Sequence, residues 1–577
     1  MTAVRRVVEV LHHGVLGAST AASMLVEDPA LLVVQASRRA PRRVTRAAAR
    51  ALRRGRGPSS RALAAWLDGH RAEARGHLAR ALGEDVRPGV LRRVLAEVAV
   101  ELDVPLPPGA AHRTTAARAA WRAGHVTQAQ QLAGVGPLGR RLTSERHAMS
   151  TGTRLAAPRV PASRGAQPSP GTLRALHLLT NSLPHTASGY ALRSHAVLRA
   201  QAAAGIEVAA ATRISYPVSV GLVTARDLDV VDGVPYHRLL PWTAARTPGE
   251  RMRRNAELAA RTVADLRPHV LHTTTNYTNA LVTEAVARAT GLPWVYEVRG
   301  ILEDTWAASF PTPEARATAR SSERHTLLRA REAELAAAAD HVVVLGRTVR
   351  DDLVARGVDA ARISVVPNSV DVALLGLDVS SKAARRALGL PDAGFWVGTV
   401  TSLVDYEGID VLVDAVALLR DRGVDARAAI VGDGVARPAV ERLVRERGLA
   451  DHVVVPGRVP PAEATAWYQA LDLFAVPRRD TAVTRTVVPL KPMQAMALGR
   501  PVVASDLPAL AEIVADPGAG VLVTPDDADA LADAVARIAS DDRLAQDLGA
   551  AGRQFAAGRT WSAAGARYRA LYEELAA

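Results

Sequence analysis

Short apolar runs alternate with stretches of helical periodicity from residue 173 to the end of the chain. Short runs bounded by turn residues are typical of buried strands, and apolar spacing near about 3.6 residues indicates amphipathic helices. A helix is expected at 187–204, and the final segment, 526–577, is expected to be helical. We expect strands at 173–180, 206–213, 269–275, 294–299, 341–346 and 363–367, and a second series at 395–402, 428–434, 452–457, 473–477, 501–505 and 520–524. This alternation predicts an α/β protein with two doubly wound, Rossmann-like parallel sheets, whose strand ends surround a shared crevice.

Residues 1–148 have a different pattern, rich in Ala, Leu and Arg and without strand alternation. The sequence A-A-W-x-x-G-H-x-x-x-A occurs there twice, at 64–74 and at 119–129. In each copy one helix is expected to end near the glycine and a second to begin after it. This pattern resembles a degenerate tetratricopeptide repeat. We therefore expect an N-terminal all-α, repeat-like domain in which Trp66 and Trp121 are core residues.

The remaining boundaries follow from composition. Residues 149–172 are rich in Pro, Ser, Gly and Ala and have no hydrophobic period, so a flexible linker is expected there. The two strand series divide the rest into a first Rossmann-like domain at 173–372 and a second at 373–560. A C-terminal helix at 561–577 is expected to pack back on the first of these domains.

Overall composition fits a globular protein. Of 577 residues, 48% are hydrophobic and 23% are charged. There is no cysteine, which excludes disulfides and thiolate metal sites. No stretch approaches the roughly 18 uncharged apolar residues of a membrane-spanning helix, and His12, His13 and Gly14 interrupt the first apolar run where a signal peptide would need its core. A cytoplasmic location is the simplest expectation.

The net charge of +14 is unevenly distributed. Residues 1–150 hold 24 of the 72 basic residues and only 11 of the 58 acidic residues, which leaves 48 and 47 for the remainder. A basic first domain could meet an anionic membrane surface at the inner face of the membrane, a protein partner or nucleic acid, or it could simply be a solvated surface. Nucleic acid is the least expected partner, because no known nucleic-acid motif accompanies the charge. The chain has only two lysines, Lys382 and Lys491, so a site that needs a compact point charge stands out.

Four motifs follow one another in the two α/β domains: VVPNSVD at 365–371, AAIVGDGVAR at 428–437, PGRVPPAEATAWYQALDLFAVPRRD at 456–480 and PLKPMQAMALGRPVVASD at 489–506. Together they resemble glycosyltransferase family 4, including a branch with YEG and PLKP signatures, over about residues 173–577. The resemblance implies a GT-B fold and a retaining transfer of a hexosyl group without a metal. The sugar would pass from a nucleoside-diphosphate donor, UDP- or GDP-linked, to a saccharide or lipid-linked acceptor, as in polysaccharide biosynthesis.

The PLKP block carries the candidate donor site. Pro492 suits the first turn of a helix and Gly499 its end, and the free N–H groups at such a helix start favour a diphosphate. Lys491 would pair with a phosphate, and Gln494, on the same helix face, would reach ribose or sugar hydroxyls. Lys491 is therefore our first catalytic candidate, because electrostatic stabilisation of the leaving group dominates such reactions.

Several positions depart from the family pattern. Thr486 and Gln494 stand where the family has two glutamates eight positions apart, and Ser402 and Glu407 stand where it has an arginine and a lysine. Glu407 would repel a phosphate, which suggests that Lys491 has taken over the phosphate charge. The remaining donor-binding candidates are Gly189, Ser402, Gly432, Arg458, Arg478, Arg479 and Gln494.

The first domain is expected to supply the acceptor side. The loop and helix start at 181–196 offer His185, Ser188, Gly189 and Arg193, with His185 as a catalytic candidate. Arg299 lies after a strand, where many relatives have a histidine, with Glu297 on the same strand face. Arg299 could bind phosphate or an acidic acceptor as a catalytic residue. Equally, Arg299 and Glu297 could be a buried structural pair.

Other activities remain as alternatives. Loss of both family glutamates is also what a catalytically inactive GT-B protein would show, one used as a nucleotide-sugar or glycan binding and assembly module. An epimerase or phosphorylase is less favoured. No paired carboxylates indicate a hydrolase, and no cluster of Asp or His predicts a metal site.

Overall fold

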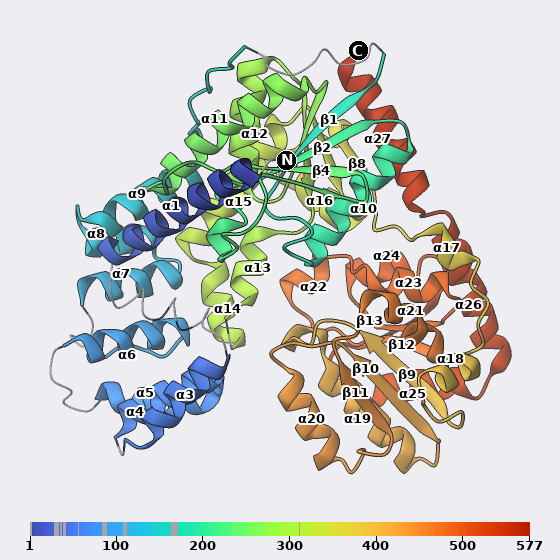
Figure 1. The fold of residues 1–577 in the computed structure, drawn as a ribbon. Coiled ribbons are helices and arrows are strands. Elements are labelled where there is room, and N and C mark those ends of the chain that lie inside the picture. Colours follow the sequence, from blue (N-terminus) through green and yellow to red (C-terminus); the bar gives the residue numbers. More distant parts are fainter. Residues whose placement is uncertain are drawn as a thin grey trace.

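Two parallel-sheet domains and a set of N-terminal helices make up the protein (Figure 1). The computed structural model describes residues 3–27, 34, 37, 42–55, 57–83, 89–107, 112–162, 171–310 and 312–577. In Figure 1 the helical region is blue, the first sheet domain is mainly green, and the second is orange.

The first domain is built on an eight-stranded sheet with the order β3-β4-β2-β1-β5-β6-β7-β8. Its strands are β1 (Arg174–Leu179), β2 (Glu207–Thr212), β3 (Leu228–Val231), β4 (Val234–Arg238), β5 (Val270–Thr274), β6 (Trp294–Val298), β7 (His341–Val344) and β8 (Ile363–Val365). All neighbours pair in parallel except β3 and β4, which form an antiparallel hairpin at the edge. The hairpin was not predicted. Its two-residue turn is Asp232-Gly233, and both residues have positive φ, 47° and 80°, as a tight hairpin turn requires.

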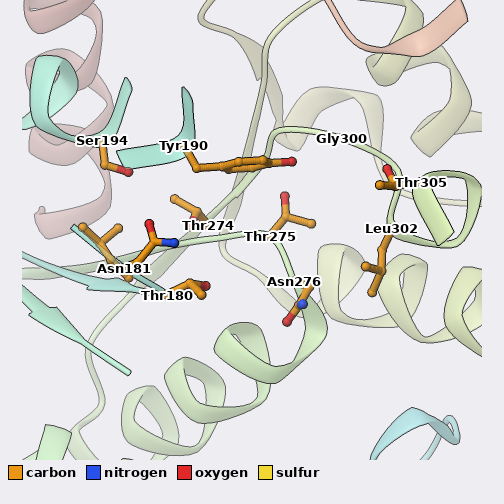
Figure 2. Close-up of a pocket in the computed structure, with 11 residues that line it drawn as sticks. Thr180, Asn181, Tyr190, Ser194, Thr274, Thr275, Asn276, Gly300, Leu302 and Thr305 are labelled. Atoms are coloured by element: carbon orange, nitrogen blue, oxygen red, sulfur yellow. The ribbon is translucent and has the colours of Figure 1, made fainter. Parts of the chain in front are cut away.

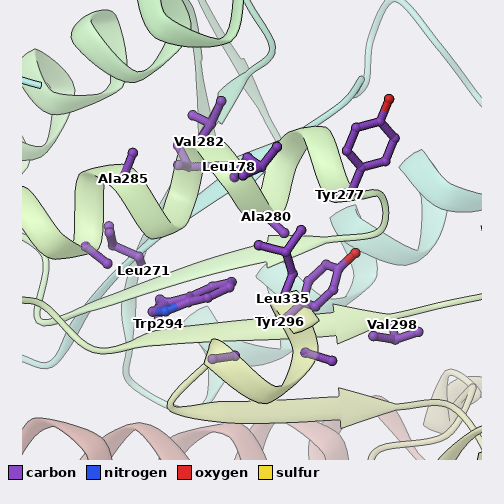
Figure 3. Close-up of a cluster of buried hydrophobic side chains, with 14 of the residues drawn as sticks. Leu178, Leu271, Tyr277, Ala280, Val282, Ala285, Trp294, Tyr296, Val298 and Leu335 are labelled. Atoms are coloured by element: carbon purple, nitrogen blue, oxygen red, sulfur yellow. The ribbon is translucent and has the colours of Figure 1, made fainter. Parts of the chain in front are cut away.

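Helices cover both faces of this sheet. They are α10 (Gly189–Ala203), α11 (Pro248–Leu266), α12 (Tyr277–Thr290), α13 (Leu302–Ala308), α14 (Pro313–Arg320), α15 (Glu323–Ala338) and α16 (Arg347–Ala355), with short 3-10 turns at Val218–Val220 and Ala360–Arg362. Figure 3 shows Ala280 and Val282 of α12 beside the sheet residues Leu271 and Tyr296. Strands buried on both faces explain why the sequence shows continuous apolar runs and no alternation.

The second domain has a six-stranded parallel sheet with the order β11-β10-β9-β12-β13-β14. Its strands are β9 (Phe395–Val400), β10 (Ala426–Val431), β11 (Val453–Gly457), β12 (Leu473–Val476), β13 (Val502–Ser505) and β14 (Gly520–Val523). Its helices are α17 (Val372–Leu375), α18 (Ser381–Ala387), α19 (Ile409–Asp421), α20 (Arg437–Glu446), α21 (Pro461–Ala470), α22 (Ala482–Thr486), α23 (Lys491–Ala497), α24 (Pro508–Val514), α25 (Ala528–Ala539) and α26 (Asp542–Ala557), with a 3-10 turn at Asp405–Glu407. Two separate cores lie on the two faces of the sheet.

The last helix, α27 (Trp561–Ala576), returns to the first domain. The chain enters the second domain beside the point where it leaves, because the Val370 N–H donates to the Arg559 carbonyl at 2.9 Å. α27 lies against α10 so closely that a Cβ on Gly565 would come within 2.3 Å of the Ala200 carbonyl oxygen. Tyr568 and Tyr572 of α27 are fully buried in the core on that face of the first sheet.

The N-terminal region is helical in all its described elements: α1 (Ala3–Glu27), α3 (Arg42–Arg53), α4 (Pro58–Asp68), α5 (Arg71–Gly83), α6 (Val90–Glu101), α7 (Arg113–Arg122), α8 (Val126–Ala133) and α9 (Pro137–Met149). The two sequence copies form the pairs α4–α5 and α7–α8. Each pair turns at a glycine with positive φ, 86° at Gly69 and 91° at Gly124. Val126, Ala148 and Met149 share a core with the first sheet, so α8 and α9 are packed onto that domain.

The expectation of a flexible linker over 149–172 is wrong for its first half. Met149 ends α9, and residues 150–162 lie along the first domain. Glu334 accepts from the Gly152 N–H at 2.8 Å, and the fully buried Arg331 donates to the Thr153 carbonyl at 2.6 Å. Composition does not reveal these contacts, because the polar partners come from α15. Residues 163–170 lie outside the described residues.

Candidate functional site

Lys491 lies at the end of the second sheet where its parallel strands terminate. It begins α23, and its Nζ donates to the Thr401 hydroxyl at 2.7 Å, directly after β9. Burial lowers the pKa of Lys491, and the nearby Glu407 opposes that shift. No carboxylate forms an ion pair with Lys491 among the described residues. A half-buried ammonium whose only hydrogen-bond partner in the described chain is a neutral hydroxyl is poised to accept an anion.

Gly432 shapes the same corner. Its φ is 144°, and a Cβ there would come within 1.7 Å of the Thr401 carbonyl oxygen. The turn after β10 therefore packs directly on the backbone of Thr401, whose hydroxyl accepts from Lys491. The structure gives Gly432 a close-packing role beside the candidate site. Ser402, which follows Thr401 in the chain, is exposed.

Two of the predicted phosphate-binding arginines are engaged by carboxylates. Arg478 is buried and paired with Glu407 at 2.8 Å, and it also donates to the Val487 carbonyl at 3.1 Å. Arg479 contacts the carboxylates of Asp405, Asp410 and Asp526. The expectation that Glu407 would repel a phosphate is therefore wrong, because Arg478 neutralises it, and the same pair removes Arg478 as a free phosphate ligand.

Arg458 and Gln494 are predicted donor-binding residues whose side chains are not engaged by other described residues. Arg458 is exposed directly after β11 and has no ion pair within the described chain. Gln494 is half-buried on α23, one turn after Lys491, and its side chain has no hydrogen-bond partner among the described residues. Thr486, at the other position that departs from the family pattern, bonds its own helix through the Ala482 carbonyl at 3.1 Å.

In the first domain, Arg299 and Glu297 form the buried structural pair that the sequence offered as an alternative. Its guanidinium donates to Glu297 at 3.1 Å, to the Ser194 hydroxyl at 2.7 Å and to the Tyr190 carbonyl at 3.0 Å. Glu297 has 0% exposure and also binds Arg193 and the neutral ring of His272, whose pKa burial lowers. Arg299 is thus a structural residue behind the cleft wall, and the expectation that it contacts substrate is not supported by this geometry.

His185 lies in the loop that follows β1, and Gly189 lies directly after this loop. His185 is hydrogen-bonded to Asp229 at 2.9 Å, and Asp229 is also bound by Arg238 at 2.7 Å, so His185 is engaged by the edge hairpin. Gly189 is the first residue of α10, which Ser188 caps by accepting from the Ala191 N–H at 3.2 Å.

A cavity of about 200 Å³ opens at the strand ends of the first sheet (Figure 2). Its walls come from the ends of β1 and β5, the first turns of α10, and Gly300 with α13. The side chains of Asn181, Tyr190 and Thr275 line it, and none of its eleven lining residues carries a charge. We call it the polar cavity. Sequence reasoning missed these residues, although their place after parallel strands was a usable signal.

The polar cavity borders the second domain. A Cβ on Gly300 would lie 3.6 Å from Val487, four residues before Lys491. Nearby, the Asn368 side-chain amide donates to the Val488 carbonyl at 3.0 Å, and Arg193 holds that Asn368 side chain at 2.9 Å. Farther along, Glu512 accepts from the Arg347 N–H at 2.8 Å. The polar cavity therefore lies beside the segment of the second domain that leads into the PLKP block.

Metal-binding clusters and membrane-spanning helices are both absent from the described residues. No group of three or more His, Asp or Glu side chains is placed to hold a metal ion within the described chain. Among the described helices, none combines the length and apolar character needed to cross a membrane.

Comparison with known proteins supports the predicted architecture. Residues 188–369 match the family model described as Glycosyl transferase 4-like domain, and residues 394–541 match that described as Glycosyl transferases group 1. Sucrose-phosphate synthase from Thermosynechococcus elongatus has a TM-score of 0.57 at 23% identity, over 70% of this chain and 99% of that one. Anabaena Alr3699/HepE in complex with UDP-glucose has a TM-score of 0.54 at 18% identity, over 70% and 99%. These likenesses confirm a GT-B fold of two parallel-sheet domains.

Curated relatives match only in part. A GDP-mannose-dependent alpha-(1-6)-phosphatidylinositol monomannoside mannosyltransferase of Mycolicibacterium smegmatis is 32% identical over 40% of this chain and 62% of its own length. A D-inositol 3-phosphate glycosyltransferase of Corynebacterium diphtheriae is 32% identical over 45% of this chain and 62% of its own length. The matched part of the chain thus spans less than two thirds of these relatives.

Proposed function

We propose that this chain, which carries a glycosyl transferase 4-like domain followed by a glycosyl transferases group 1 domain, moves a sugar from a nucleoside-diphosphate sugar to a hydroxyl acceptor. The observation that carries the proposal is Lys491. Its half-buried ammonium has no carboxylate partner in the described chain and faces the end of β9. A negatively charged diphosphate completes that site, since a buried cation needs a counter-charge.

In the proposed reaction the bond between the anomeric carbon and the diphosphate oxygen breaks, and negative charge develops on the phosphate. Lys491 stabilises that charge, and Arg458 adds a second cation at the same carboxyl end of the parallel strands. Gln494 hydrogen-bonds ribose or sugar hydroxyls. The acceptor hydroxyl attacks from the face that the phosphate leaves and gives its proton to a phosphate oxygen, so the configuration is retained. Loss of one such charge-assisted contact costs about 10²–10³ in rate.

The donor base is proposed from the relatives. One curated relative is named for its use of GDP-mannose, and one structural neighbour is a complex with UDP-glucose. We propose a UDP- or GDP-linked hexose as the donor, transferred without a metal ion. Activity that persists in excess EDTA would support metal independence, and activity restored only by a divalent cation would contradict it.

Thermal stabilisation by a panel of nucleoside diphosphates and nucleotide sugars tests the donor site. A ligand at 100 times its Kd adds about 2.7 kcal/mol of stability. We expect one nucleotide to stabilise the wild type and to lose this effect in Lys491→Ala. Lys382→Ala is a matched control, because Lys382 is the other lysine and is exposed on α18. Absence of any shift across the panel would overturn the proposal.

A second candidate function rests on the positions that lack the family glutamates. Thr486 and Gln494 leave the candidate site without either carboxylate. A catalytically inactive protein would still bind a nucleotide sugar through Lys491 and use it for glycan binding or assembly. Release of free nucleoside diphosphate in the presence of sugar acceptors distinguishes the two functions. Stabilisation by nucleotide without any such release would favour the binding module.

A further inference from the structure

The polar cavity has a size that suits one ring. Its volume of about 200 Å³ is below the roughly 300–1,000 Å³ of pockets that hold drug-sized ligands. Its wall at Gly300 lies beside Val487 of the second domain. A ligand seated there can place one group at the second domain while the rest of a longer molecule extends out of the cavity.

The side chains that line the cavity can form hydrogen bonds, and none of them is charged. The Asn181 amide and the Tyr190 hydroxyl have no hydrogen-bond partner in the described part of the chain, and both line the cavity (Figure 2). An amide supplies two donors and an acceptor, and a phenol can donate or accept, which matches ring hydroxyls. The Tyr190 ring and Leu302 supply apolar surface for the C–H face of the same ring. Figure 2 shows the Tyr190 ring reaching across the space above Thr275.

No side chain of the lining carries a positive charge to pair with an anion. The nearby cations, Arg193 and Arg299, lie behind the wall with 4% and 5% exposure. Their guanidinium groups bind Glu297, backbone carbonyls, Asn368 and Ser194. Protein sites for phosphate normally offer accessible Arg or Lys side chains, and none lines this cavity. A phosphate in the polar cavity would lose its hydration without such a partner.

We propose that the polar cavity binds the terminal ring of an uncharged saccharide or cyclic polyol as the acceptor, and that it discriminates against a phosphorylated ring. The inference rests on the proposed transferase function and specifies its acceptor class. It separates this protein from the curated relatives named for D-inositol 3-phosphate. Asn181 and Tyr190 are the specificity-determining residues, because each presents to the cavity a hydrogen-bonding side chain without a partner in the described part of the chain.

Saturation-transfer NMR on the full-length protein tests the inference. The probes are methyl α-mannopyranoside, methyl α-glucopyranoside, myo-inositol and inositol 3-phosphate, each with and without UDP or GDP. We expect at least one neutral probe to bind and inositol 3-phosphate to bind at least about 10-fold more weakly. Tyr190→Phe and Asn181→Ala should each weaken the neutral probe by about 10-fold, the effect of one lost hydrogen bond. The circular dichroism of both variants should match that of the wild type.

The outcomes separate this inference from the donor site. Lys491→Ala should lose nucleotide stabilisation and keep binding of the neutral probe in the absence of nucleotide. Stronger binding of inositol 3-phosphate than of every neutral probe would overturn the inference. So would nucleotide stabilisation without binding of any neutral probe, although the proposed transferase would then survive. Neutral binding that Tyr190→Phe and Asn181→Ala leave unchanged would place the acceptor elsewhere and also overturn it.

Discussion

Glu332 is a carboxyl group inside the first domain, on α15. Its oxygens accept from the Tyr277 N–H at 2.7 Å and from the Tyr296 hydroxyl, and burial raises its pKa to about 7. An unfolded glutamate titrates near pH 4.3, so the folded state binds this proton more tightly. The resulting stability is fully present below about pH 4 and is lost as the pH rises through 7.

Replacement of Glu332 removes that titration. Glu332→Gln stays neutral, so we expect the wild type to lose roughly 3 kcal/mol relative to the variant between about pH 5 and pH 8. Urea unfolding at both pH values measures the difference. Glu257→Gln is the control, because the Glu257 side chain on α11 is 42% exposed and its replacement should change stability by less than about 0.5 kcal/mol. Equal pH dependence in wild type and Glu332→Gln would contradict the assignment.

Single residues were predictable where composition marked them and not where their partners lie far along the chain. Lys491 stands out because the chain has only two lysines. Arg478 could not be assigned from sequence, since Glu407 lies 71 positions away. The same limit applies to the contacts of Arg299 with α10, whereas its pairing with Glu297 was one of the two alternatives that the sequence offered. Local sequence shows which side chains are chemically suitable, and tertiary contacts decide which of them stay free.

At the scale of elements, the two helix–turn–helix copies differ in what their glycines meet. A Cβ on Gly124 would lie 2.4 Å from the Ser322 hydroxyl and 2.8 Å from the Trp306 ring, whereas Gly69 has nothing within 4 Å. Arg324 stacks on both Trp306 and Trp121 at the same junction. Trp306 belongs to α13, which also lines the polar cavity through Leu302 and Thr305. The second copy therefore supports one wall of the cavity.

The pair of glycines gives a matched experiment. Both have positive φ, so alanine at either position costs about 1–2 kcal/mol of backbone strain. Gly124→Ala adds a clash with Ser322 and Trp306, and we expect about 1–3 kcal/mol more destabilisation than for Gly69→Ala. Hydrogen exchange of α13 and α15 measures the local effect. Equal protection of α13 in the two variants would argue against the supporting role.

Strands and helices followed the hydrophobic pattern closely, with one omission. The β3–β4 hairpin was missed because both strands are short and half-exposed, which leaves little apolar signal. The Asp232-Gly233 pair was the available clue, since such a pair favours a two-residue hairpin turn. The type of an element is encoded locally, and the hydrophobic pattern that encodes it is weakest in edge strands.

At the scale of the whole molecule, α27 is part of the first domain. The Tyr572 hydroxyl contacts His272 at 2.6 Å and accepts from Gln201 at 2.9 Å, and Tyr568 and Tyr572 both have 0% exposure. Truncation after Thr560 would expose this core. We expect α10 and β5 to lose protection in hydrogen exchange, while β9 and β12 of the second domain keep theirs as an internal control. Unchanged protection of β5 would contradict the dependence.

The large-scale layout was predictable except where segments meet. Two sheet domains, the returning helix and the helical N-terminal region all followed from the order of patterns. The attachment of 150–162 did not, because Pro- and Gly-rich composition describes the segment alone and Glu334 and Arg331 lie on another element. Contacts between segments that are distant in the chain depend on the surfaces of folded elements, and the hydrophobic pattern of one segment does not describe those surfaces.

The adjacent crossings at Val370 and Thr560 have a consequence for how the protein is made. A ribosome releases the chain from its N-terminus at about 5–20 residues per second, and domains generally fold as their parts emerge. The second domain is contiguous and has all its strands before α27 is translated. The first domain, although it begins earlier, lacks Tyr568 and Tyr572 until α27 is translated. Of the two sheet domains, the one whose strands are translated first is therefore the one that is completed later.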